Sequence, residues 1–155
     1  MLRISKLSTF LLATIATMSF VKTVQAQPTE TLTVIVDGIK HQKGQVCLRV
    51  FSNEKGFPQG DSGGVQSGCS QIKGTTLTKE FYGLKPGTYA VGIVDDQNGD
   101  HKLNSNLFGI PEEGFGVSNN PTISIATGSP KFSQSSFVVK KNTTIKIHMK
   151  YSLDK

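Results

Sequence analysis

The chain has 155 residues, a formal net charge of +6 and an apolar fraction of 36%. A chain of this length and composition forms one globular domain with a hydrophobic core. The basic residues are spread along the sequence and form no basic stripe, so we expect no nucleic-acid partner.

The first 26 residues have the pattern of an export signal. Arg3 and Lys6 precede an apolar run from Leu7 to Phe20, and Val24 to Ala26 fits a small-x-small cleavage site. A membrane anchor is the weaker alternative, because this run is shorter than the roughly 20 residues that a spanning helix needs. We therefore expect a mature chain of residues 27–155 that is periplasmic or secreted and does not span the membrane.

The two cysteines, Cys47 and Cys69, both belong to the expected mature chain. An exported protein with two cysteines most simply pairs them, and closing this loop would stabilise the fold by about 3 kcal/mol. The alternative is two separate thiols, with Cys47 filling a strand position as a small apolar residue. A metal or redox pair is disfavoured, because neither cysteine has a neighbour in CxxC spacing.

The first half of the mature chain alternates apolar and polar residues. This alternation predicts one strand from Thr31 to Asp37 and a second, more central strand from Gly44 to Phe51. The glycine-rich segment Asn53–Gly68 predicts a long loop, which a Cys47–Cys69 bridge would pin at its base. Two further strands are predicted, and they cover Ser70–Lys73 and Thr75–Phe81.

A turn and a strand follow in the segment LKPGTYAVGIV, which begins at Leu84. Pro86 and Gly87 set a turn of the kind that connects the two sheets of Greek-key sandwiches, and the hydroxyl of Tyr89 is expected to bond a backbone group upstream, as in a tyrosine corner. An ordinary turn with a core tyrosine is the alternative. Both readings predict a strand over Tyr89–Val94.

The rest of the chain reads as a long loop followed by more strands. Asp95–Asn120 has no sustained period, yet its apolar residues, which include Phe108, predict a loop folded back onto the domain. A short strand is predicted at Thr122–Ala126, and a hairpin-like pair at Phe137–Lys140 and Thr143–Tyr151. No helical period occurs after the signal, so the chain is predicted to be an all-β, antiparallel Greek-key β-sandwich of seven or eight short strands.

The acidic stretch after the tyrosine strand is the strongest candidate for a metal site. Its residues match positions 1, 3, 5, 7 and 9 of a calcium loop, position 7 through its carbonyl, and they are Asp96, Asn98, Asp100, Lys102 and Asn104. The match fails at positions 6 and 12, occupied by His101 and Leu107, so other carboxylates would have to complete a Ca²⁺ site: Asp95, Glu112 or Glu113. The alternative is that these side chains bond the loop's own amides.

Evidence for catalysis in the sequence is thin. A metal held by Asp96, Asp100 and His101 could activate water in a small hydrolase or lyase. One histidine rarely makes a transition-metal site, and there is no GxSxG elbow. We therefore expect a protein that is not an enzyme, with the metal-dependent hydrolase or lyase as the alternative.

Three segments together carry a family resemblance: GQVCLRVFSNEKGFP, GLKPGTYAVGIVDDQNGDHKLNSN and GIPEEGFGVSNN. They resemble the bacterial exported family called domain of unknown function 2141. The resemblance implies a prealbumin-like or immunoglobulin-like sandwich with no attached enzymatic activity. Family members usually carry glycine in place of His101 and aspartate in place of Asn104, which weakens the calcium prediction.

The resemblance also implies that Gly109–Asn120 packs against the acidic loop, so Glu113, Asn119 and Asn120 become further candidates for a site. We expect an exported, non-catalytic binding or structural module of the cell envelope that works through Asp95–Asn106 and Gly109–Asn120, because loops at one end of a sandwich are where such folds place recognition. The expected partner is an envelope protein, a glycan or a second copy of the chain. A third hypothesis is that the protein is a purely structural subunit of an envelope assembly.

Overall fold

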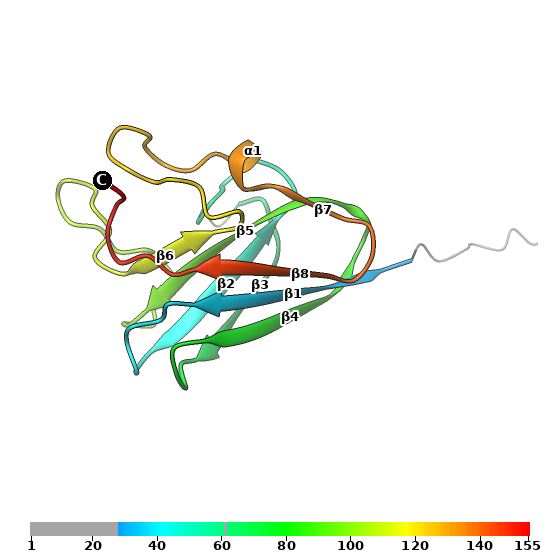
Figure 1. The fold of residues 1–155 in the computed structure, drawn as a ribbon, viewed down its shortest axis with the longest axis horizontal. Coiled ribbons are helices and arrows are strands. Elements are labelled where there is room, and N and C mark those ends of the chain that lie inside the picture. Colours follow the sequence, from blue (N-terminus) through cyan, green and yellow to red (C-terminus); the bar gives the residue numbers. More distant parts are fainter. Residues whose placement is uncertain (1–27, 61) are drawn as a thin grey trace, which may run out of the picture.

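The structure is a computed structural model that describes residues 28–60 and 62–155 (Figure 1). The predicted export signal over residues 1–26 lies outside the described residues. Within the described ranges, no helix has the length and apolar character needed to cross a membrane.

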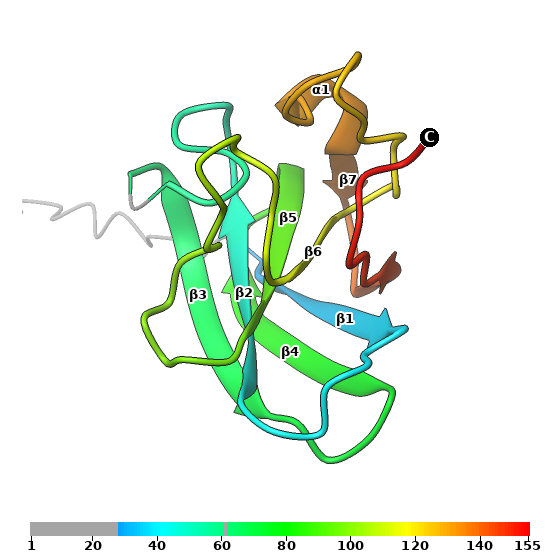
Figure 2. The ribbon, with the colours of Figure 1, turned by 90° about the vertical axis from the view of Figure 1, so that its left-hand side faces the viewer.

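Eight strands and one short helix make up the described part of the chain. The strands are β1 Glu30–Asp37, β2 Gln45–Phe51, β3 Gly64–Gln71, β4 Leu77–Leu84, β5 Gly87–Asp96, β6 Gly114–Val117, β7 Phe137–Val139 and β8 Thr143–His148, and helix α1 covers Phe132–Ser135. One sheet has the order β4-β1-β8; the other has the order β3-β2-β5-β6, with β7 also paired to β5. Figure 2 shows these sheets as two layers, with β2, β3 and β5 running across β1 and β4.

The predicted all-β sandwich is therefore confirmed, but several strands and pairings differ from the prediction, and β6 forms within the predicted loop Asp95–Asn120. The strand pair β1–β8 is parallel, whereas the other pairs are antiparallel. The predicted hairpin of the last two strands is wrong, because β7 pairs with β5 and β8 pairs with β1 in the opposite sheet. No strand forms at Thr122–Ala126.

The glycine-rich loop is shorter than predicted. Strand β3 begins at Gly64 and pairs with β2 along its length, so the third strand includes Gly64–Gly68, which the composition assigned to the loop. Backbone hydrogen bonds to β2 need no side chain, which is why a segment poor in apolar residues still forms a strand.

The core lies between the two sheets and is built mainly from apolar positions that alternate along the strands. Each of these side chains is at most 8% exposed, because the period of two turns every second residue of a strand toward the facing sheet. They include Leu32, Val34, Val36, Val46, Leu48, Val50, Phe81, Leu84, Tyr89, Val91, Ile93, Ile147 and Met149.

The turn between β4 and β5 carries the chain from one sheet to the other, as the LKPGTY motif predicts. The hydroxyl of Tyr89 donates a hydrogen bond to the carbonyl of Lys85 at 2.8 Å, and the ring is buried. This bond satisfies the hydroxyl four residues upstream, so the predicted tyrosine corner is confirmed.

A second apolar cluster lies outside the main core. Phe115, Val117 and Ile123 are buried there, and Phe57, Leu103 and Leu153 pack against them. At Gly92 the carbonyl oxygen of Pro58 passes so close to β5 that an added Cβ would lie 2.1 Å from it. The loops that precede β3 and follow β5 and β6 are therefore packed onto the five-stranded sheet.

Candidate functional site

Strand β5 ends in two carboxylates, Asp95 and Asp96, that are fully buried. Asp95 Oδ2 lies 2.9 Å from His41 Nδ1 and also accepts a hydrogen bond from the hydroxyl of Tyr151, while Asp95 Oδ1 accepts one from the side-chain amide of Gln97. Burial of the phenol, followed by its bond to Asp95, raises the pKa of Tyr151 to about 12. Asp95 thus connects β5 to the loop before β2 and to the C-terminal segment.

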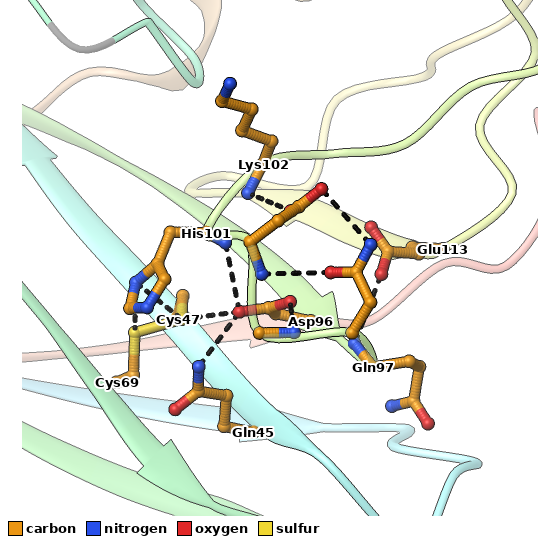
Figure 3. The surroundings of a disulfide bond; sticks show 11 residues. Gln45, Cys47, Cys69, Asp96, Gln97, His101, Lys102 and Glu113 are labelled. Atoms are coloured by element: carbon orange, nitrogen blue, oxygen red, sulfur yellow. Dashed lines mark hydrogen bonds between the residues drawn. A yellow bond between two sulfur atoms is a disulfide. The ribbon is translucent and has the colours of Figure 1, made fainter.

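Asp96 is turned toward the neighbouring strand and the following loop. Its Oδ2 accepts hydrogen bonds from Gln45 Nε2 at 2.9 Å and from the backbone N–H of His101 at 3.2 Å, and its Oδ1 accepts one from the N–H of Gly99 at 2.7 Å (Figure 3). A buried carboxylate needs such donors, because burial without them costs several kcal/mol. Asp96 therefore fixes the course of the loop from Gly99 to His101.

Three of the predicted calcium ligands do lie together: Asn98, Asp100 and Asn104. Asp100 Oδ2 accepts hydrogen bonds of 3.1 Å from the side-chain amides of both asparagines, and Asp100 Oδ1 accepts one of 2.8 Å from the N–H of Lys102. These bonds, that of the Lys102 N–H first, lower the pKa of the Asp100 carboxyl. All four carboxylate oxygens of Asp96 and Asp100 thus accept N–H groups, which is the turn chemistry considered as the alternative to calcium.

Glu113 joins the acidic loop to β6. Its carboxylate is buried and accepts hydrogen bonds from the backbone N–H of Gln97 at 3.1 Å and from that of Asn104 at 3.0 Å. The expected packing of the two loops is therefore present. Asn119 and Asn120 do not join this cluster, because they bond backbone carbonyls near α1 and on β8 respectively, at 2.9 and 3.2 Å.

The predicted disulfide between Cys47 and Cys69 is present, and its cysteines are directly opposite each other on β2 and β3. Figure 3 shows the imidazole of His101 beside it: Nδ1 lies 3.4 Å from Cys69 Sγ and 3.9 Å from Cys47 Sγ. The disulfide forms part of the wall of a hollow of about 260 Å³ that His101 also borders. No sequence pattern indicates that His101 lies beside the disulfide, because this contact depends on where the acidic loop folds.

Figure 1 shows the loop after β5, the loop after β6 and the C-terminus at the same end of the sandwich. Residues of these segments line a larger hollow of about 570 Å³. Among the described residues, no charged side chain lines it; it is bordered by Gln59, Leu103, Ser105, Phe108, Gly109, Ile110, Pro111, Phe115, Ile123, Ser124, Ile125, Gly128, Ser129, Pro130 and Leu153. Phe108 and Ile125 are more than four-fifths exposed, and the adjacent Leu107 is fully exposed. The prediction that the apolar residues of this loop fold back onto the domain is right for Phe115 and wrong for Phe108.

Comparison with known proteins agrees with the motifs in the chain. No curated protein and no solved structure matches it. Residues 34–146 match the family DUF2141, described as an uncharacterized protein conserved in bacteria. This match covers most of the described β-sandwich, and the chain therefore belongs to the DUF2141 family.

Proposed function

We propose that this protein is an exported, non-catalytic binding module of the cell envelope that holds an apolar segment of a partner protein in the larger hollow. The single observation that carries the proposal is the set of exposed apolar side chains around that hollow: Leu107, Phe108 and Ile125. Exposed apolar groups gathered at a concave surface mark sites of protein or ligand binding.

The lining favours a polypeptide as the occupant. The described residues that border the hollow are uncharged, which favours an occupant that is uncharged where it makes contact. The hydroxyls of Ser105, Ser124 and Ser129 and the amide of Gln59 border the apolar surface, and such groups can bond the peptide groups of a bound segment.

Hydrogen bonds within the loop after β5 hold the backbone that carries Phe108 and Ile110. Asn106 Oδ1 accepts from the N–H groups of Phe108 at 3.0 Å and Ile110 at 3.1 Å, and Ser105 pairs with Pro111 in an isolated β-bridge. A preformed loop loses less conformational entropy when it binds, which increases affinity. Export is supported by the N-terminal sequence pattern and by the disulfide, since disulfides persist in oxidising compartments.

Photo-crosslinking in living cells tests the proposal. A benzophenone side chain at position 108 should crosslink to one envelope protein, whereas the same group at the matched exposed position 138 on β7 should not. A synthetic peptide of the crosslinked segment should then bind the purified protein, and Ile125→Ser should weaken its binding at least about tenfold, a loss of about 1.4 kcal/mol. Val138→Ser is the control.

Equal crosslinking at both positions, or no adduct at position 108, would remove the hollow as the binding site. An adduct with a lipid would identify an acyl chain as the occupant, and an adduct with a second copy would identify self-association; either result overturns the assignment to a partner segment. Because Phe108 and Ile125 are exposed, their substitution should leave the thermal midpoint unchanged.

We also propose that calcium stabilises the Asp96–Asn104 loop, and a separate experiment tests this. The side-chain oxygens of Asn98, Asp100 and Asn104 are not buried, but each accepts a hydrogen bond within the loop, so a cation would have to replace these bonds. If Ca²⁺ binds there, it must raise the thermal midpoint by mass action, and Asp100→Asn must abolish the rise. If calorimetry shows no heat and the midpoint is the same in chelator, hydrogen bonds alone hold the loop.

A further inference from the structure

The Cys47–Cys69 disulfide lies on the outer face of the five-stranded sheet, away from the main core. Val46 and Leu48, the neighbours of Cys47 along β2, point into the core, so Cys47 points the other way. Both cysteines are only partly buried, and both border the hollow of about 260 Å³. The sulfur atoms are therefore accessible to small molecules, unlike those of a bridge enclosed in a core.

The acidic loop holds the backbone of His101 where its imidazole reaches these sulfur atoms. His101 has a left-handed backbone (φ 62°), and its N–H bonds Asp96 Oδ2, which Gln45 also holds. A left-handed residue other than glycine is uncommon and persists where surrounding bonds impose it. The position of the His101 backbone thus follows from the fold of the loop, and the ring that it carries contacts both sulfur atoms.

We propose that reduction of this disulfide creates a zinc site in which Cys47 Sγ, Cys69 Sγ and His101 Nδ1 are the protein ligands. Among the described residues, these three form the one group of His, Cys, Asp or Glu side chains whose ligand atoms all lie within 4.8 Å of one another. Two thiolates and an imidazole form a typical donor set for Zn²⁺, and three protein ligands leave a fourth position for water or another ligand from the hollow.

The distances fit a tetrahedral ion. Bonds of about 2.3 Å to sulfur and about 2.05 Å to nitrogen place sulfur and nitrogen ligands about 3.6 Å apart at the tetrahedral angle. The observed separations of His101 Nδ1 from the two sulfur atoms are 3.4 and 3.9 Å, one slightly shorter and one slightly longer. Small side-chain rotations therefore bring the imidazole into place.

The two sulfur atoms remain neighbours without their bond. Cys47 and Cys69 are a directly opposed pair in the antiparallel β2–β3 ladder, and backbone pairing on both sides of them fixes this register. Opposed residues hold their Cβ atoms about 4.5–5.5 Å apart, which suits the sulfur-to-sulfur separation of about 3.8 Å on a tetrahedral zinc. The backbone thus presents both thiolates on the same face of the sheet.

The chemistry balances with a dithiol as the reductant. The bond between the two sulfur atoms breaks, Cys47 and Cys69 each gain one proton and one electron, and the dithiol closes to its own disulfide. Zinc then displaces the two thiol protons to solvent and takes the lone pair of His101 Nδ1, which requires the ring proton on Nε2. Oxidation reverses these steps and releases the ion.

Cobalt titration of the purified protein tests the site, because Co²⁺ bound by thiolates gives a sulfur-to-metal charge-transfer band. The protein reduced by a phosphine without air should develop this band with one Co²⁺ per chain, and Zn²⁺ should displace the cobalt. The oxidised protein should develop no band. His101→Gly, which suits the left-handed backbone, should weaken zinc binding at least about tenfold in competition with a chromophoric chelator. His148→Gln, a change at an exposed histidine on β8, should have no effect.

Three results would each overturn the proposal. The first is a reduced protein that binds no Co²⁺ while its circular dichroism remains that of the oxidised protein. The second is His101→Gly binding zinc as tightly as the unaltered protein, which would remove His101 as a ligand. The third is unfolding of the chain on reduction, because the site requires the β2–β3 register to survive without the disulfide.

Discussion

Replacing Glu113 by glutamine should loosen the acidic loop by a calculable amount. The buried carboxylate accepts one hydrogen bond from the N–H of Gln97 and one from the N–H of Asn104. A glutamine amide keeps one acceptor and turns an NH₂ group toward the other N–H, so one charge-assisted bond is lost at a cost of about 1.5–3 kcal/mol. For a domain of this size, the thermal midpoint should fall by ~6–12 °C.

Calorimetric melting measures the total loss, and amide hydrogen exchange locates it. In Glu113→Gln the exchange of Gln97 and Asn104 should accelerate while that of the central β5 amides changes little, because the loop opens locally. Glu113→Ala removes both acceptors and should cost up to about twice as much. Glu112→Gln, a change at the exposed neighbour, is the matched control. A Glu113→Gln protein as stable as the unaltered one, with unchanged exchange at both amides, would refute the claim that Glu113 holds the loop.

Three further predictions concern stability. Serine at both Cys47 and Cys69, which are 22 residues apart, should lower the free energy of unfolding by about 3 kcal/mol in urea denaturation, and an unchanged midpoint would argue against the bridge. Burial raises the pKa of Tyr151 to about 12. The neutral phenol therefore stabilises the fold fully below its ordinary pKa of 10.0, and this stabilisation is lost as the pH rises toward 12. In thermal melts at increasing pH, Tyr151→Phe should reduce this alkaline loss of stability. The Lys146 ammonium lowers the pKa of the Asp37 carboxyl, so Asp37 stabilises the fold above pH 3.8, and the deficit of Asp37→Asn at neutral pH should disappear as the pH falls below 3.8.

The strands could be predicted where burial imposes a period of two. Leu32, Val34 and Val36 alternate along β1 because the facing sheet covers one side of that strand, and the alternation is visible in the sequence. The turn at Pro86 was predictable for a similarly local reason, since proline, glycine and the tyrosine corner lie within six residues. By contrast, β3 was partly missed because its backbone pairing with β2 leaves no apolar pattern.

Local sequence patterns could not predict which distant segments pair with each other. The last two strands look like a hairpin in sequence, yet they belong to different sheets, and β8 lies parallel to β1 at the opposite end of the chain. The partners of the buried carboxylates are equally remote: His41 and Tyr151 are 54 and 56 residues from Asp95. No residue pattern in the acidic loop indicates that His41 and Tyr151 would bond the Asp95 carboxylate.

The contacts of the acidic loop also change how its carboxylates are interpreted. Asp and Asn side chains in a calcium-like spacing suggested ligands, with Glu113 as a candidate from outside that spacing, but Asp96 and Glu113 accept hydrogen bonds from backbone N–H groups. Through those bonds Asp96 positions His101 beside the disulfide, and Glu113 fixes the start of the segment that carries Phe108. Asp96 and Glu113, which the sequence suggested as ligands, therefore stabilise the loop backbone. The groups carried by that loop are an imidazole next to two sulfur atoms and an exposed phenyl ring at an apolar hollow, and these groups face potential ligands.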